Sequence, residues 1–287
     1  MVSVRKLADL QLSAASGLVR MGGRLLVVAD DELFLDAYGA DGERQARLPL
    51  HGRSALPEEH HERKRLKPDL EALVALPGRR ILAMGSGSAP QRRTAFLFAA
   101  PSDGALPEFQ HVVDLAPLYD HLSRTFPELN LEGAAAAGGR LRLLQRGNGA
   151  QAQNAVIDLA LDRTLEALAT GAPFTAQLLL DVRPVELPRL GKVRLGFTDA
   201  SPVAEDDPRV VFVCAAEDTD DPYLDGACAG SAIGVLDPLA RVEWLEPLEG
   251  KHKVEGVTVE PGAQRALLVA DPDDRSQRAP LLECSLE

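Results

Sequence analysis

The stretch Asn130-Leu131-Glu132-Gly133-Ala134-Ala135 places one carboxylate at the head of a run of small apolar residues. The pattern returns as Lys253-Val254-Glu255-Gly256-Val257 and, with alanine in place of glycine, as Asp69-Leu70-Glu71-Ala72-Leu73. Two further stretches carry a hydroxyl in the slot of the carboxylate, namely Ala15-Ser16-Gly17-Leu18-Val19 and Phe197-Thr198-Asp199-Ala200. The five residues in this slot, called the anchors below, are Ser16, Glu71, Glu132, Thr198 and Glu255.

The spacing of the anchors is typical of a repeat array. Consecutive anchors are 55, 61, 66 and 57 residues apart. Each anchor starts an apolar run, which is followed by a tight turn, an arginine, a second apolar run and a polar cluster. The arginines are Arg24, Arg80, Arg140, Arg209 and Arg265. Two apolar runs joined by a tight turn predict a β-hairpin, and five such units in order predict a repeat fold.

Repeated antiparallel units are typical of the blades of a β-propeller. Only 32 residues follow the last anchor, whereas the other units have room for four strands. Residues 1–12 alternate between apolar and polar before the first anchor, so we expect them to complete the last unit beside Pro280–Ser285 and to remove an exposed sheet edge. The sequence therefore predicts an all-β, five-bladed β-propeller in which residues 1–287 form a single domain, with blades starting near residues 16, 71, 132, 198 and 255.

A few segments depart from the strand pattern or extend it. The charged run 60–67 is expected to be a solvated excursion or a short helical turn, with a basic binding patch as the alternative. Residues 114–126 space their apolar side chains as a helix does. In the third unit we expect further strands at residues 155–161, 165–170 and 177–183.

Composition and charge exclude several classes of function. The chain has 287 residues and is 45% hydrophobic, which is ample for a large core, and its net charge of −12 argues against nucleic-acid binding. No run reaches the roughly 18 apolar residues that a membrane helix needs. The three cysteines, Cys214, Cys228 and Cys284, form no C-x-x-C pair, and their odd number suits a reducing compartment. We expect a cytoplasmic monomer that binds neither nucleic acid nor membrane.

In a propeller the innermost strands line a central channel, so strands that begin at the anchors would bring all five anchors to one end of it. Three glutamates around one axis repel one another. A hard divalent cation such as calcium, which takes about 6–8 oxygen ligands, relieves that repulsion. The alternative is that the glutamates cap neighbouring backbone amides beside a water-filled channel.

With this arrangement the chain resembles the calcium-activated nucleotidase (apyrase) family, whose members are five-bladed propellers with one calcium ion on the axis. The residues that carry the resemblance are Ser16-Gly17-Leu18-Val19, Asp69-Leu70-Glu71-Ala72-Leu73, Leu131-Glu132-Gly133-Ala134, Gly196-Phe197-Thr198-Asp199 and Lys253-Val254-Glu255-Gly256. The resemblance implies calcium ligands at Ser16, Glu71, Glu132, Thr198 and Glu255. The chain departs from the family where Asp69 and Asn130 replace a common lysine and Thr198 replaces serine. The same blade starts also look like those of bacterial phytase-like and esterase-like propellers.

Two classes of function follow from this. The first is a metal-dependent hydrolase of a small anionic substrate, a phosphate ester or anhydride, in which Asp31, Glu217 or Asp271 acts as general base. Its substrate-binding residues would be Ser86, Arg92, Arg93, Arg146 and Asn148. The second class is a non-catalytic propeller with a structural ion, acting as a ligand- or protein-binding module.

Two loops carry hypotheses of their own. Residues 85–88 followed by Arg92 and Arg93 form either a phosphate cradle of backbone amides and arginines or a plain glycine-rich turn. The loop 217–226 is rich in carboxylates, which predicts either a second metal site or a solvated turn.

Overall fold

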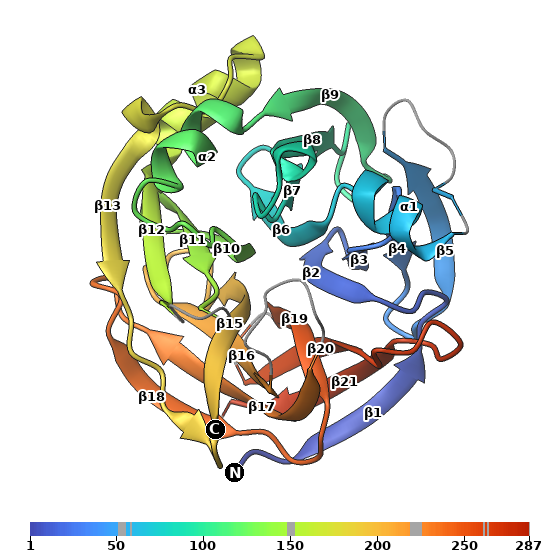
Figure 1. Ribbon diagram of the computed structural model, residues 1–287. Coiled ribbons are helices and arrows are strands. Elements are labelled where there is room, and N and C mark those ends of the chain that lie inside the picture. The colour runs from blue at the N-terminus through green and yellow to red at the C-terminus, as the bar shows by residue number, and fades with distance from the viewer. Residues whose placement is uncertain are drawn as a thin grey trace.

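Five antiparallel β-sheets surround a central axis in the computed structural model of the chain (Figure 1). The structure describes residues 1–50, 56–57, 59–147, 153–218, 226–260, 262 and 264–286. Four of the sheets have four strands each and the remaining sheet has five. The prediction of an all-β, five-bladed propeller is therefore confirmed.

In blades one to three the strands run in sequence order from the inside of the blade to its outside, whereas blade four has an extra strand and blade five takes one strand from the start of the chain. Blade one contains β2 (Ala15–Met21), β3 (Arg24–Ala29), β4 (Phe34–Tyr38) and β5 (Arg44–Pro49). Blade two contains β6 (Leu70–Leu76), β7 (Arg80–Gly85), β8 (Thr94–Ala99) and β9 (Glu108–Asp114). Blade three contains β10 (Leu131–Ala137), β11 (Arg140–Gln145), β12 (Ala155–Ala160) and β13 (Leu179–Pro184). Blade four contains β14 (Arg189–Leu190), β15 (Val193–Pro202), β16 (Val210–Asp218), β17 (Ala227–Leu236) and β18 (Val242–Pro247). Blade five contains β19 (Lys253–Val259), β20 (Arg265–Asp271), β21 (Pro280–Ser285) and β1 (Val4–Asp9).

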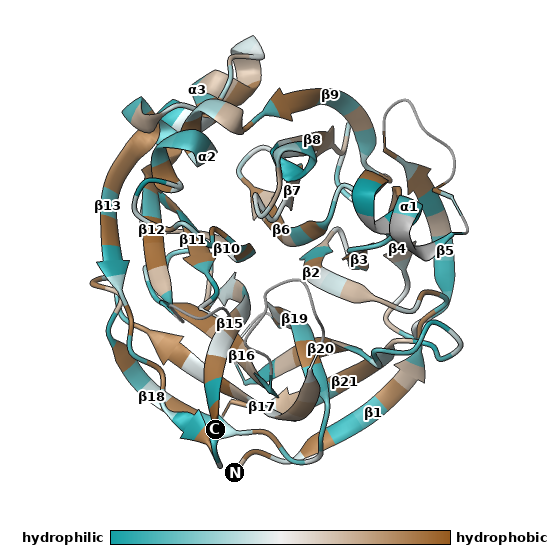
Figure 2. Cartoon of the chain, viewed as in Figure 1, coloured by the Kyte–Doolittle hydropathy of each residue, from teal (hydrophilic) through white to brown (hydrophobic). Residues whose placement is uncertain are grey.

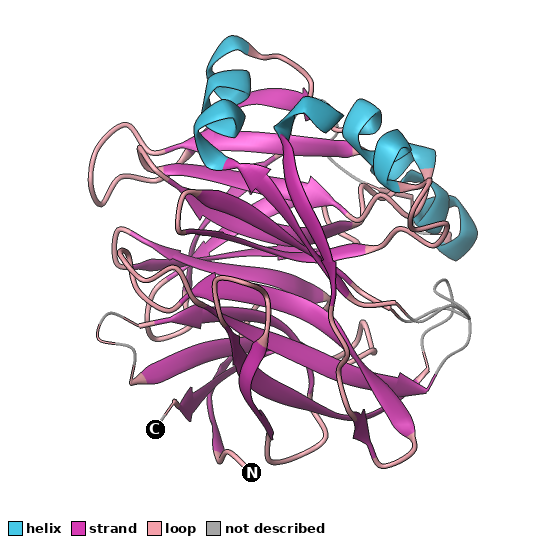
Figure 3. Cartoon of the chain, turned by 90° about the vertical axis from the view of Figure 1, so that its left-hand side faces the viewer, coloured by secondary structure: helices cyan, strands magenta, loops and turns pink. Residues whose placement is uncertain are grey.

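Blade five is built from both ends of the chain. Strand β1 pairs antiparallel with β21, so that Val4 lies opposite Cys284 and Asp9 opposite Pro280. The two termini accordingly lie close together in both views (Figures 1 and 3). This confirms that the N-terminal strand completes the last blade, and it covers an edge of β21 that would otherwise be open to other chains.

The apolar core is divided into five clusters, and each cluster fills the space between two neighbouring blades. Between blades five and one, for example, Leu18 and Val27 pack with Val269 and Leu281. Each blade thus buries its two faces against its neighbours, as repeat proteins do. The outermost strands, such as β1 and β13, mix hydrophobic and hydrophilic residues and have no fully buried position, because only one of their faces is covered (Figure 2).

Every anchor is the extra residue of a β-bulge in the innermost part of its blade. In blade three Leu131 pairs with Gln145 and Gly133 with Leu144, which leaves Glu132 without a partner in the ladder. The same one-residue shift occurs at Ser16, Glu71, Thr198 and Glu255. Because a bulge takes one residue out of the ladder and re-aims its side chain, the repeated sequence pattern marks five equivalent bulges.

Among the described residues, three short α-helices accompany the strands (Figure 3). Helix α1 (His60–Leu66) lies in the charged run 60–67, for which a short helical turn was one of two expectations, and helix α2 (Ala116–Leu122) lies in residues 114–126, where a helix was expected. The strand expected at residues 165–170 is wrong, since this segment belongs to helix α3 (Leu161–Thr170), which ends at Gly171 with a left-handed φ of 69°. The physical reason is that one face of the helix, with Leu165 and Leu168, packs against the core between blades two and three. Within the described residues no helix is long and apolar enough to cross a bilayer.

Deleting residues 1–9 is expected to destabilise the fold and to make it self-associate, because β21 then exposes an unpaired edge. The loss should be about 3 kcal/mol, since each lost backbone hydrogen bond contributes roughly 0.5–1.5 kcal/mol. Urea denaturation and light scattering measure the two effects, and a peptide of residues 1–9 added in trans should reverse both. A truncated chain that is monomeric and as stable as the full chain would contradict the role of β1.

Candidate acidic site on the propeller axis

Three of the five anchors bring their carboxylates together. One oxygen from each of Glu71, Glu132 and Glu255 lies within 4.8 Å of the other two. These residues come from blades two, three and five, and each sits at its blade's bulge. Glu132 and Glu255 are buried and Glu71 is half-buried. The structure thus gathers residues that are far apart in the sequence into one acidic group.

The three glutamates hold their protons more tightly than free carboxyl groups do. Burial raises the pKa of Glu132, and burial raises the pKa of Glu255 well above its usual range. The pKa of Glu71 is also raised well above its usual range, first by burial and then by the negative charges of Asp69 and Glu132. The site is therefore short of positive charge.

Arg146 contacts the acidic group from blade three. Its Nη1 lies 2.8 Å from Glu132 Oε2 and 3.7 Å from Glu255 Oε1, and its Nη2 lies 2.9 Å from Glu217 Oε2. The guanidinium thereby joins blades three, four and five. Asn130 Nδ2 donates a hydrogen bond of 2.5 Å to the other oxygen of Glu132, so this carboxylate is held from both sides.

Lys253 is the second cation of the group. Its Nζ lies 2.8 Å from Asp273, 3.4 Å from Glu217 and 3.7 Å from Glu255. Asp271, whose Oδ2 is 3.9 Å from the same Nζ, borders the site. Burial raises the pKa of Asp271 to about 7 although Lys253 opposes the shift.

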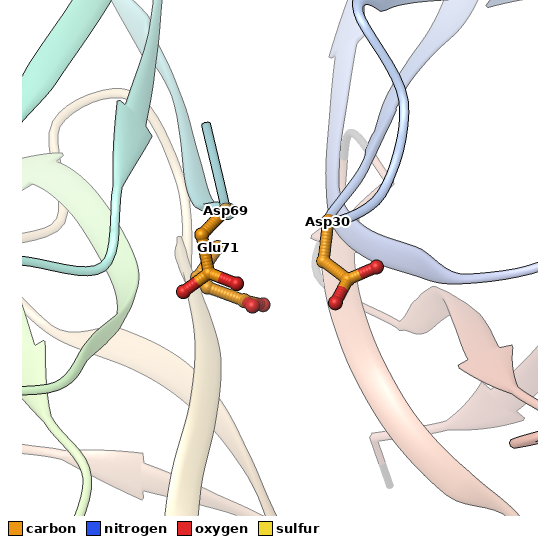
Figure 4. Close-up of side chains that lie close together, drawn as sticks. All are labelled: Asp30, Asp69 and Glu71. Atoms are coloured by element: carbon orange, nitrogen blue, oxygen red, sulfur yellow. The ribbon is translucent and has the colours of Figure 1, made fainter. Parts of the chain in front are cut away.

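A second acidic group shares Glu71 with the first. Asp30 reaches from blade one toward Asp69 and Glu71 of blade two (Figure 4), and one oxygen of each lies within 4.8 Å of the other two. Lys67 bridges this group, because its Nζ contacts the carboxylate of Asp30 and lies 2.9 Å from Asp69 Oδ1. No hydrogen bond or ion pair to the Glu71 carboxylate is found in the part of the chain that the structure describes.

The glycine-rich turn at residues 85–88 surrounds a carboxylate of the protein itself. Ser86 Oγ donates to Asp69 Oδ2 at 2.5 Å, and Arg92 Nη1 donates to the same oxygen at 2.7 Å. Burial pushes the pKa of Asp69 upward, but Lys67 and Arg92 outweigh it and the net shift is downward. An incoming phosphate would have to displace Asp69 from this turn.

The two hydroxyl anchors connect neighbouring blades. Ser16 Oγ donates to the carbonyl oxygen of Leu70, and Thr198 Oγ1 donates to that of Val254 at 2.7 Å. Each acceptor residue directly precedes a glutamate anchor, so the hydroxyls fix the backbone at Glu71 and Glu255. Their predicted role as metal ligands remains a prediction.

The other predicted site residues are spread around this group. Asp31 pairs with Arg63 at 3.3 Å and Arg275 at 3.1 Å. Arg93 pairs with the exposed Asp120 of helix α2 and not with the acidic group. Asn148 and residues 219–225 lie outside the described residues, so the structure leaves open the hypotheses about them.

Sequence reasoning gave no role to Lys67, Lys253 or Asp199. Asp199 is fully buried, and its Oδ2 accepts a hydrogen bond from Val257 N at 2.8 Å. Burial raises the pKa of Asp199 well above its usual range, although the amides of Leu18, Ala134 and Val257, from three other blades, act against the shift. The sequence does single out Asp199, because it directly follows the anchor Thr198, whereas glycine or alanine follows every other anchor.

Comparisons with known proteins give a family and a fold. The sequence model of the "Family of unknown function (DUF6929)" matches residues 11–286. A search of curated proteins finds no match. Solved structures similar in shape include U3-55K, at 10% identity and a TM-score of 0.46 over 99% of this chain and 98% of that one. A luciferin-regenerating enzyme is 12% identical with a TM-score of 0.48 over 100% and 96% of the two chains. These likenesses carry no argument about function, and the comparisons do not show the nucleotidase family.

The raised pKa of Asp271 predicts a specific pH dependence. Because the native state binds this proton more tightly than the unfolded chain, wild type should lose stability relative to Asp271→Asn as the pH rises from about 4 to about 7. The change should be about 2 kcal/mol, since one pKa unit corresponds to about 1.4 kcal/mol and partial exposure screens the charge. Urea denaturation in chelator measures it, with Asp103→Asn in an exposed turn as control. If the stability of wild type relative to Asp271→Asn increased over this pH range, the raised pKa of Asp271 would be contradicted.

Proposed function

The chain belongs to the DUF6929 family of unknown function, and we propose that it binds one hard divalent cation, calcium in the first place, on the propeller axis. The observation that carries the proposal is the convergence of Glu71, Glu132 and Glu255 within 4.8 Å. Within the described residues, Glu255 Oε1 is buried without a hydrogen-bond partner. Buried polar atoms normally have a hydrogen-bond partner, so an unpartnered buried oxygen supports the proposal that a ligand binds there.

The donor set fits such an ion. Calcium prefers carboxylate, carbonyl and water oxygens at about 2.3–2.6 Å, so two of its ligands are at most about 5 Å apart. The three glutamates of the acidic group, with Glu217, Arg146 and Lys253, carry a net charge of −2 when all are ionised, and Asp271 and Asp273 beside Lys253 add further negative charge. A divalent cation would offset part of that excess. A zinc ion is less favoured, because neither histidine nor cysteine belongs to the acidic group.

Each residue of the site has a distinct part in holding the ion. Glu71 is half-buried and, within the described residues, unpaired, so it offers the side of the site that solvent reaches. Glu132 is oriented by Asn130 before any ion binds. Ser16 and Thr198 fix the backbone beside two of the glutamates. A bound ion would act as a Lewis acid and as a stabiliser of the ring.

A second candidate function is hydrolysis of a small anionic phosphate ester or anhydride. The observation that favours it is Asp271, whose pKa of about 7 suits a general base near neutral pH. Arg146 and Arg92 already pair with carboxylates, so the ion itself would supply most of the attraction for an anion. The many acidic side chains nearby would oppose a phosphate, and this favours the non-catalytic alternative.

Calcium should raise the melting temperature of the protein and a chelator should lower it. Ion at 100 times its dissociation constant stabilises the fold by about 2.7 kcal/mol, and Glu132→Gln should remove most of this gain because it removes a ligand charge. Differential scanning calorimetry measures the shift. Glu283→Gln, on the outer strand β21 away from the axis, is the matched control and should keep the full shift. A melting temperature that changes with neither calcium nor chelator would contradict the cation site.

The hydrolase candidate is tested with nucleotides, phosphate esters and lactones in the presence of calcium, magnesium or manganese. If it is right, at least one substrate turns over, its rate rises with pH through about 7, and Asp271→Asn lowers kcat by roughly 10²–10⁴-fold. Asp31→Asn and Glu217→Gln test the two other predicted bases. If no substrate turns over with any metal while calcium still binds, the chain is a cation-dependent binding module.

A further inference from the structure

We infer that Arg146 is a resident counter-cation that competes with the divalent cation for Glu132 and Glu255, so that this arginine sets how tightly the ion binds. The inference rests on the proposed cation site. It concerns the regulation of that site, and it assigns to Arg146 a role opposite to the anion contact expected from the sequence.

The contacts of Arg146 coincide with the ligands proposed for the ion. Its Nη1 faces Glu132 Oε2 at 2.8 Å and Glu255 Oε1 at 3.7 Å. Any cation that takes oxygens of both glutamates therefore enters the space that the guanidinium faces. Arg146 is only 4% exposed, so it cannot turn freely into solvent when that happens.

The surroundings of Arg146 are shaped to keep its side chain at the axis. A Cβ atom at Gly196 would lie 2.9 Å from Arg146 Cγ and 3.3 Å from its Nε, so only glycine leaves room for the arginine stem. The backbone N–H of Arg146 donates to Asn130 O at 2.8 Å, which fixes the start of the side chain. These contacts hold the Arg146 side chain in one position at the site.

Without an ion, the guanidinium balances three carboxylates from three blades. Removing one partner of a buried ion pair leaves an uncompensated buried charge and is strongly destabilising. A bound ion would repel the same guanidinium and displace it from Glu132 and Glu255. The guanidinium would keep its contact with Glu217, which lies 2.9 Å from its Nη2. The arginine thus stabilises the ion-free propeller and weakens ion binding, and both effects come from the same contacts.

The test is Arg146→Met, studied by calorimetry with calcium as the probe. In chelator the variant should melt at a lower temperature than wild type. It should bind calcium roughly tenfold more tightly or better, because a positive charge next to the ion is gone. Its melting temperature should also rise more on addition of calcium than that of wild type.

Arg142→Met is the matched control. Arg142 lies on strand β11, which ends one residue before Arg146; it is 1% exposed and pairs with Asp158 at 3.2 Å, away from the acidic group. Its loss should lower the melting temperature in chelator and leave the calcium affinity unchanged. If Arg146→Met does not fold, Gly196→Ala decides, because it displaces the arginine stem and keeps every charge; it should tighten calcium binding as well.

The outcomes separate the inference from the proposed function. Equal calcium affinities in wild type and Arg146→Met, or in wild type and Gly196→Ala when the former does not fold, overturn the competition and leave the cation site standing. Calcium binding by the variant and not by wild type supports the competition and overturns the site in the native chain. If calcium binds to neither, the proposed function fails and the inference falls with it.

Discussion

The repulsion between carboxylates on the axis is the constraint on which the rest of the site depends. Five bulges direct five anchors inward, and three of these carry negative charge. Buried like charges are tolerated only when cations compensate them or when protons bind. Arg146 and Lys253 compensate one side of the ring, and Lys67 compensates the other. Glu71 belongs to both acidic groups, and burial first, then the charges of Asp69 and Glu132, raises its pKa well above its usual range.

The polar interactions at the axis also hold the blades to one another. The hydroxyl anchors donate across the boundaries between blades one and two and between blades four and five. Asp199 faces backbone amides of three other blades from a fully buried position. Apolar packing between neighbouring blades supplies most of the burial, and these polar contacts add links between the blades at the axis. A change in charge at the axis should therefore change the global stability of the protein.

The repeated local pattern carried enough information to predict the fold. The anchors, the hairpin turns and the short last unit predicted five blades and their closure by residues 1–12, because each of these signals lies within a few residues of sequence. Helix α3 was missed because its packing against the core between blades two and three is a tertiary effect. The partners of Lys67 and Arg146 were also missed, since ion pairs between blades depend on which strand ends meet in space. For the turn at residues 85–88 a phosphate cradle and a plain glycine-rich turn were both open, and nothing in its own sequence shows that Asp69 fills it.

A divalent cation held between Glu71, Glu132 and Glu255 would be located by anomalous diffraction from crystals grown with manganese in place of calcium. We expect one strong anomalous peak among these three carboxylates, with the Arg146 guanidinium moved away from Glu132. No peak at the axis at high manganese concentration, with the guanidinium still paired to Glu132 and Glu255, would contradict it.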